Sequence, residues 1–277
     1  MKRALIFATT FVVLVALLAA CGNDGSKDAG FEVASQVVSD ETTQDILVFE
    51  PVAEGSWPVV VAMHGIDGEG QDMAEIGRHL AREGVVVFAP TYRTDMTTEA
   101  SIEEAATDLE CAYRFVRSIA ADHGGDLDRP VTFFGWSLGA TAALGLGMLD
   151  DIDPSGDLKC FSPVPRPDVI VAASGCYYEW QGKPSDLIDV ASLGNEDANV
   201  VLVGGEDDTN CAASQTEDLA AELRASGYDP EVVMLEGANH YAPVFHDLVD
   251  GNWTVVPDEP AGQQTVEVVL DAIAASG

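Results

Sequence analysis

One serine of this chain stands in a pattern that is typical of an activated nucleophile. The run Gly135-Trp136-Ser137-Leu138-Gly139 matches Gly-x-Ser-x-Gly and directly follows the apolar run Val131–Phe134. Small residues on both sides permit a sharp turn from strand to helix. Such a turn holds the hydroxyl at a helix N-terminus, where developing negative charge is favoured. The pattern therefore predicts nucleophilic catalysis by Ser137.

A serine hydroxyl is a poor nucleophile unless a base takes its proton. Among the five histidines, His240 follows the strand-like run Glu231–Leu235 through Gly237-Ala238-Asn239. This spacing predicts a loop at the carboxyl end of a strand. We predict that His240 is the base, with His246, a few residues further on, as the alternative.

The histidine needs a carboxylate that orients it and stabilises its cationic form. The apolar run Val200–Val203 ends in Gly204-Gly205-Glu206-Asp207-Asp208, which places several acids after another strand. Counting from the two glycines leaves Asp207 and Asp208 as the candidates. We predict that Asp208 takes this role.

The elements that must position these residues alternate between strand and helix signals. Short apolar runs typical of strands occur at Val59–Met63, Val85–Ala89, Val131–Phe134, Val169–Ala172, Val200–Val203 and Glu231–Leu235. Helical spacing occurs at Gln71–Arg82, Ser101–Ala121, Ser137–Met148, Ala213–Ala225 and Thr265–Ala275. This alternation indicates an α/β fold with a mostly parallel sheet and helices on both faces. Ligands of such sheets bind at the carboxyl ends of the strands, where the three predicted residues lie.

The chain order Ser137, Asp208, His240 resembles that of the α/β-hydrolase superfamily. The resemblance extends over nearly all of residues 31–277, and the most similar branches are dienelactone hydrolases and bacterial esterases and lipases. It implies the α/β-hydrolase fold with a small lid or none. It also implies a serine hydrolase that cleaves a carboxylic ester, from a small molecule or a lipid, through an acyl-enzyme on Ser137. This chemistry requires no cofactor and no metal.

His64-Gly65 resembles the oxyanion loop of the same superfamily, and the run from Ala89 to Arg93 is also similar. Ile66 and Leu138 would then supply the two backbone N–H groups that stabilise the oxyanion. Two departures blur the subfamily: the loop reads His-Gly-Ile-Asp-Gly rather than His-Gly-Gly-Gly, and Trp136 stands where many relatives carry histidine.

The same three residues would serve other reactions. An acyltransferase, a thioesterase or a peptidase can share the site, since one fold hosts many functions. A surface lipoprotein that binds without turnover is the alternative from a different class.

The resemblance also suggests where the remaining cysteines pair. Cys176 and Cys211 follow neighbouring strands, so a bridge between them would brace the loop of Asp208, and Cys111 would pair with Cys160. Residues 177–195 lie where this fold inserts its lid. Tyr177, Tyr178 and Trp180 would line a substrate pocket there, or would serve only local packing.

The N-terminal residues have the pattern of a targeting segment. Lys2 and Arg3 precede the apolar run Leu5–Ala20, which is short for a membrane span and typical of a signal peptide. Leu18-Ala19-Ala20-Cys21 resembles the lipobox of bacterial lipoproteins. We therefore expect a signal peptide at 1–20, a lipidated Cys21 with a flexible tether at 21–30, and the folded domain at 31–277. This predicts export and a lipid anchor on the outer face of a bacterial membrane.

The charge of the chain is strongly negative. It carries 13 Lys and Arg against 47 Asp and Glu, a formal net charge of −34. Such a surface repels phosphate backbones and anionic headgroups. We therefore expect no nucleic-acid partner and a covalent rather than an electrostatic attachment to the membrane. The sequence indicates no oligomeric state.

Overall fold

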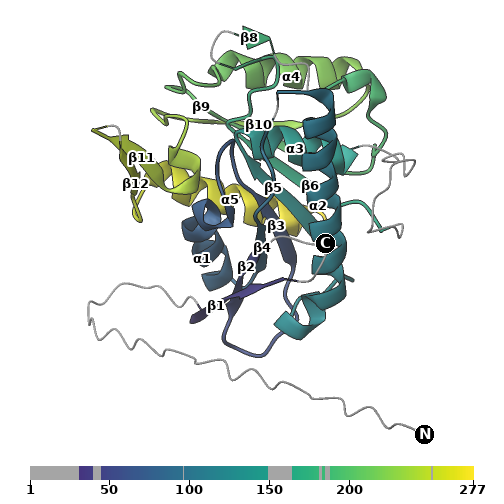
Figure 1. Ribbon diagram of the computed structural model, residues 1–277, viewed down its shortest axis with the longest axis vertical. Helices are drawn as coiled ribbons and strands as arrows, with labels where there is room; N and C mark the ends of the chain where they lie inside the picture. Colours follow the sequence, from purple (N-terminus) through teal and green to yellow (C-terminus); the bar gives the residue numbers. More distant parts are fainter. Residues whose placement is uncertain are drawn as a thin grey trace, which may run out of the picture.

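The central feature of the fold is a sheet of eight strands in the order β1-β2-β4-β3-β5-β6-β9-β10 (Figure 1). The computed structural model describes residues 31–39, 45–95, 97–148, 164–180, 183–184, 188–250 and 252–277. The strands are β1 (Val33–Val38), β2 (Ile46–Pro51), β3 (Val59–Met63), β4 (Val86–Pro90), β5 (Val131–Trp136), β6 (Val169–Ala173), β9 (Asn199–Gly205) and β10 (Glu231–Leu235). β2 pairs antiparallel with β1 and β4, whereas all pairs from β4 to β10 are parallel. The expected mostly parallel sheet is therefore present.

Helices cover both faces of this sheet (Figure 1). One face packs against α1 (Ala74–Arg82) and α5 (Pro260–Ala275), and the other against α2 (Glu99–Ile119), α3 (Leu138–Met148) and α4 (Ala213–Ala225). Neighbouring residues of one strand point to opposite faces. Val61 and Met63 of β3 accordingly join the core under α2 and α3, whereas Val60 joins the core under α1 and α5.

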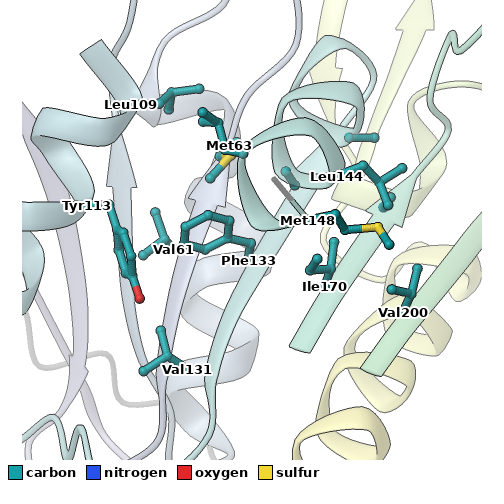
Figure 2. Packing of buried hydrophobic residues seen from close by; sticks show 14 of the residues in the cluster. Val61, Met63, Leu109, Tyr113, Val131, Phe133, Leu144, Met148, Ile170 and Val200 are labelled. Atoms are coloured by element: carbon teal, nitrogen blue, oxygen red, sulfur yellow. The ribbon is translucent and has the colours of Figure 1, made fainter. Parts of the chain in front are cut away.

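The core on the α2–α3 side explains why α3 is apolar all round. Phe133 of β5, Leu144 of α3 and Ile170 of β6 interdigitate there, and each is almost fully buried (Figure 2). Tyr113 of α2 closes this layer with its ring edge-on to Phe133 at 4.7 Å between centroids. α3, which begins directly after Ser137, is thereby packed against the sheet.

Smaller elements complete the described part of the chain. They are the 3₁₀ turns η1 (Gly70–Met73), η2 (Ala120–His123), η3 (Val190–Ser192) and η4 (Ala242–Val244), and the two-stranded pairs β7 (Glu179–Trp180) with β8 (Lys183–Pro184) and β11 (His246–Val249) with β12 (Asn252–Val255). The β11–β12 hairpin stands out from the body of the molecule beside α5 (Figure 1). No helix among the described residues is long and apolar enough to span a bilayer.

The structure corrects the predicted start of the last helix. α5 begins at Pro260, five residues before the predicted Thr265. Proline at the first helical position needs no hydrogen-bond partner for its nitrogen. The side chain of Glu259 caps the helix by accepting from the N–H of Ala261, so the helix can begin at this proline.

Candidate active site

Ser137 occupies a strained turn between β5 and α3. Its φ is +58°, in the left-handed region that residues with a Cβ rarely adopt. Its N–H donates to the carbonyl of Ala173 on β6 at 2.9 Å, and its own carbonyl accepts from Ala140 at 3.0 Å. These bonds hold the strained turn, as expected for a serine that must be raised above the sheet.

The two glycines of the motif are required by close approach of the backbone. A Cβ on Gly135 would lie 2.0 Å from the carbonyl oxygen of Gly139, and one on Gly139 would lie 2.1 Å from that of Met63. Both distances are far below contact, so only glycine fits. The spacing of the motif is thus a packing requirement of the turn.

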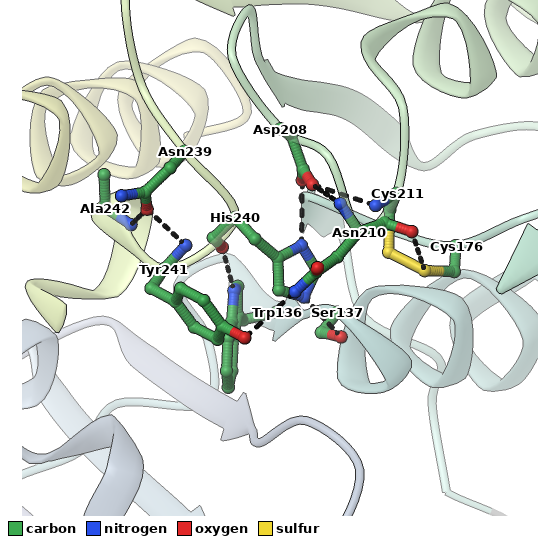
Figure 3. Close-up of polar contacts among 10 residues, drawn as sticks. All are labelled: Trp136, Ser137, Cys176, Asp208, Asn210, Cys211, Asn239, His240, Tyr241 and Ala242. Carbon is green, nitrogen blue, oxygen red and sulfur yellow. Dashed lines mark hydrogen bonds and ion pairs between the residues drawn. A yellow bond between two sulfur atoms is a disulfide. The ribbon is translucent and has the colours of Figure 1, made fainter. Parts of the chain in front are cut away.

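The structure brings Ser137, His240 and Asp208 together at the carboxyl ends of β5, β10 and β9 (Figure 3). Nε2 of His240 lies 2.9 Å from the Oγ of Ser137, and Nδ1 lies 2.8 Å from Oδ2 of Asp208. With the Nδ1 proton donated to the carboxylate, Nε2 is left as the acceptor for the serine hydroxyl. All three residues are buried, so this chain of hydrogen bonds is shielded from water.

Asp208, rather than the exposed Asp207, faces the histidine. Its Oδ1 accepts from the N–H groups of Asn210 and Cys211, each at 2.8 Å. These two bonds fix the orientation of the carboxyl group toward His240. The predicted Cys176–Cys211 disulfide is present, with 4.7 Å between the Cα atoms, and fastens this loop to the segment after β6.

The loop of His240 is held by its neighbours on both sides. The indole N–H of Trp136 donates to the carbonyl of His240 at 2.7 Å. The side-chain oxygen of Asn239 accepts from the N–H groups of Tyr241 and Ala242, and its amide donates to Oδ1 of Asp247 at 2.9 Å. These supports could not be predicted from the sequence, because hydrogen-bond partners across a fold leave no local pattern.

His246, the alternative base, lies elsewhere. It is buried at the start of β11, where its Nδ1 lies 2.8 Å from the carbonyl of Val244. Burial lowers its pKa from the ordinary value, because the charged form loses hydration. The structure therefore pairs His240, and not His246, with Ser137.

The loop after β3 lies directly against Ser137. A Cβ on Gly65 would lie 2.8 Å from the ring of Trp136 and 3.2 Å from the Cβ of Ser137. Ile66 follows in this loop, and Leu138 is the first residue of α3. Both residues predicted to donate to an oxyanion are thus in segments that adjoin Ser137.

His64 ties this loop to the end of β4. The N–H of Tyr92 donates to its Nε2 at 3.3 Å, which leaves Nδ1 to donate to the carbonyl of Gly65 at 2.7 Å. The hydroxyl of Tyr92 donates to the carbonyl of His64, and the two rings stack at 4.1 Å. Burial lowers the pKa of His64 and favours this neutral form. We interpret His64 as a support of the loop.

Tyr177 and Tyr178, two of the residues predicted for a lid, pack against other parts of the fold. Tyr177 is fully buried in the core, and Tyr178 bonds to Glu222 on α4. The packing alternative therefore holds for Tyr177, because its ring fills space under the sheet. The side chain of Trp180 lies outside the described residues.

Only one of the two cysteines of the second predicted disulfide, Cys111, lies among the described residues. Cys111 on α2 is disulfide-bonded, whereas its predicted partner Cys160 lies outside the described residues, as does Cys21. Within the described part of the chain, Asp208, Cys211 and His240 place potential metal ligands within 4.8 Å of one another. The Sγ of Cys211 is bonded to Cys176, which removes the thiolate that a metal would bind.

Several solved structures are similar to this chain in their overall fold. No protein-family model matches the chain, and no curated protein matches its sequence. A truncated carbohydrate esterase from gut microbiota superposes with a TM-score of 0.65 at 17% identity, covering 90% of this chain and 99% of its own. Est2 of Thermogutta terrifontis, with propionate bound, superposes with a TM-score of 0.63 at 20% identity, covering 91% of this chain and 96% of its own. Esterase B from Lactobacillus rhamnosis superposes with a TM-score of 0.69 at 16% identity, covering 90% of this chain and 87% of its own.

The chain has an α/β-hydrolase fold. The expectation from the order of Ser137, Asp208 and His240 is confirmed for the fold, while the subfamily stays a prediction.

Proposed function

We propose that this protein is a serine hydrolase that cleaves a carboxylic ester through an acyl-enzyme on Ser137. One observation carries the proposal: an unbroken chain of hydrogen bonds from the Oγ of Ser137 through His240 to Asp208. The strained turn at Ser137 supports it, since strain of this kind is kept where function requires it. The similar structures are esterases, which favours an ester over other acyl substrates.

In the first half-reaction the Oγ of Ser137 attacks the carbonyl carbon while Nε2 of His240 takes the hydroxyl proton. The carbonyl oxygen becomes an oxyanion, which the N–H groups of Ile66 and Leu138 would stabilise; removing one such donor typically costs about 10²–10³-fold in rate. His240 then gives its proton to the oxygen of the leaving alcohol, and the acyl group stays on Ser137.

In the second half-reaction water replaces the alcohol. His240 takes a proton from the water as it attacks the acyl carbon, and then returns a proton to Oγ when the acid leaves. Asp208 keeps its charge throughout and stabilises the imidazolium in both halves.

The test compares wild type with Ser137→Ala on p-nitrophenyl acetate and butyrate. We expect turnover by the wild type and its loss in the variant, together with loss of labelling by a fluorophosphonate. Equal turnover by both proteins would show that Ser137 is the wrong nucleophile. Labelling without turnover of any ester would favour a different acyl acceptor or bond.

We further propose that the chain is exported and carries a lipid on Cys21. The basic start, the apolar run and the Leu-Ala-Ala-Cys sequence support this. Metabolic labelling with an alkyne-tagged fatty acid in a bacterial host should mark the full chain and fail for Cys21→Ala. Equal labelling of both chains would contradict the proposal.

A further inference from the structure

The β11–β12 hairpin presents an apolar surface beside the His240 loop. Leu248 pairs with Trp253 across the hairpin, and His246 pairs with Val255. Residues paired in this way share a face, and the face alternates along each strand. Leu248, Trp253 and Val255 therefore lie on one face, and each is at least 40% exposed. A contiguous exposed apolar surface of this kind is typical of a binding site.

This face is continuous with the aromatic residues of the candidate active site. The ring of Trp253 lies 5.5 Å from that of Trp136, which precedes the nucleophile, and 5.1 Å from that of Tyr241, which follows the histidine. It stacks on His246 at 4.4 Å, which fixes its orientation. Tyr241 is itself held by a 2.9 Å hydrogen bond from Asn210 of the Asp208 loop (Figure 3). Trp253 is thus a well-supported ring with a large exposed part.

The position of Trp253 relative to His240 indicates which half of an ester it would contact. Nε2 of His240 must reach the oxygen of the leaving alcohol, so the alcohol departs on the histidine side of Ser137. The ring of Tyr241 meets that of His240 edge-on at 5.1 Å, and Trp253 packs against Tyr241. The hairpin therefore lies on the side of Ser137 from which the alcohol leaves.

Charge narrows the class of alcohol. The sequence has no lysine or arginine after Arg224, so the only charged residues of the hairpin are the acidic Asp247 and Asp250, and Asp258 follows shortly after it. A negatively charged alcohol would be repelled, whereas an uncharged ring can stack on an indole. We infer that Trp253 of the β11–β12 hairpin binds an uncharged ring, whose face lies against the indole, on the alcohol portion of the ester substrate, a role that rests on the proposed function.

The experiment measures kcat/KM, which reports the steps through acylation while the alcohol is still present. The esters are phenyl acetate, an acetylated methyl glucoside and ethyl acetate, which have an aryl ring, a sugar ring and no ring. Wild type is compared with Trp253→Ala, Trp253→Phe and Leu248→Ala. Val52→Ala serves as the control, because Val52 is also an exposed apolar residue and follows β2, which lies beside the edge strand β1 and six places from β10 in the strand order.

We expect Trp253→Ala to lower kcat/KM about tenfold for one or both ring-bearing esters and to leave ethyl acetate within about twofold. Which ring responds distinguishes an aryl from a sugar alcohol. Trp253→Phe should keep most of the activity, Leu248→Ala should show a smaller loss of the same pattern, and the control should match wild type.

Across p-nitrophenyl esters of increasing acyl length, Trp253→Ala should lower kcat/KM by the same factor for every ester. Wild type should also prefer phenyl acetate over 4-acetoxybenzoate, whose ring carries a carboxylate.

Three outcomes would overturn the inference. An equal loss on ethyl acetate would make Trp253 a structural support only, a change confined to long acyl chains would place it on the acyl side, and no change on any ester would remove it from the site. Each of these is compatible with a serine esterase. Turnover that survives Ser137→Ala, or no turnover of any ester by wild type, would instead overturn the proposed function itself.

Discussion

Asp207 and Asp208 are adjacent in the chain but differ in their environment. Asp208 is buried and bonded to His240 and to two backbone N–H groups, whereas Asp207 is exposed. Asp208→Asn keeps the size of the side chain but removes the charge that stabilises the imidazolium. We expect kcat to fall about 10⁴-fold, and Asp207→Asn to stay near wild type. Equal losses in the two variants, measured with p-nitrophenyl acetate, would contradict this assignment.

Asn239 and Asp247 allow a sharper test of how the histidine is positioned. The amide of Asn239 donates to Asp247, and its oxygen accepts from two N–H groups of the His240 loop. Asn239→Asp would place two carboxylates in contact, so we expect kcat to fall roughly tenfold or more. Adding Asp247→Asn exchanges donor and acceptor, which restores the bond between the two side chains. The same Oδ1 of Asp247 also accepts from the N–H of Leu248, and an amide group that donates to the new carboxylate from this position gives up that second bond.

The double variant should therefore regain part of the activity lost by Asn239→Asp. Its coupling in a double-mutant cycle should lie in the range of about 0.5–3 kcal/mol that contacting residues show. The pH profile of kcat should return to that of wild type as well. Additive effects of the two changes would show that the bond does not position His240.

At the scale of elements, two glycines of α3 differ in the space around them. Gly139 lies in the crowded first turn after β5, whereas Gly145 lies further along the helix. A Cβ on Gly139 would meet the carbonyl oxygen of Met63 at 2.1 Å, whereas nothing lies within 4 Å of a Cβ on Gly145. Gly139→Ala must displace a central strand, and such overpacking typically costs about 1–3 kcal/mol, occasionally more. Gly145→Ala should instead raise the free energy of unfolding by about 0.5–1 kcal/mol, because alanine loses less entropy in a helix.

Urea unfolding of the two variants measures this difference directly. We expect the transition of Gly139→Ala to move to lower urea together with a loss of esterase activity. That of Gly145→Ala should move to higher urea with activity kept. A stable and active Gly139→Ala protein would mean that the turn is less tightly constrained than its backbone contacts indicate.

The central strands were predictable because they are buried on both faces and so appear as continuous apolar runs. β3 matched its prediction without change, and β5 and β9 differ only at their ends. β1 was missed because it is a partly exposed edge strand that mixes polar and apolar residues. The β11–β12 hairpin was missed because its strands have only four residues each. Helix starts such as that of α5 depend on caps, which periodicity does not reveal.

The candidate site was predictable to the extent that it follows from strand ends. Ser137 and His240 each lie one turn beyond an apolar run, so the topology alone brings them to one edge. The choice between two adjacent aspartates depended on counting glycines, and only the structure shows which one reaches the histidine. The supports from Trp136, Asn210 and Asn239 involve residues up to 104 positions apart, and no sequence pattern reports such contacts.

At the scale of the whole molecule, the net charge of −34 must oppose folding. Like charges brought together in a compact state repel each other. The 13 Lys and Arg residues are too few to neutralise the 47 Asp and Glu residues. Salt screens this repulsion, because the Debye length falls from about 30 Å at 0.01 M to about 3 Å at 1 M.

We therefore expect the Tm to rise by several degrees between 0.01 M and 1 M NaCl, and to rise equally in KCl. Each 1 kcal/mol of repulsion removed should add roughly 2–4 °C. A variant in which the exposed Glu54, Glu83, Glu231 and Glu236 are replaced by glutamine should start from a higher Tm and show a flatter dependence on salt. A Tm that falls with salt in wild type would mean that ion pairs such as those of Arg93 with Glu104 and Asp108 stabilise the fold more than the excess charge destabilises it. Exposed pairs of this kind are usually worth little, so the repulsion should dominate.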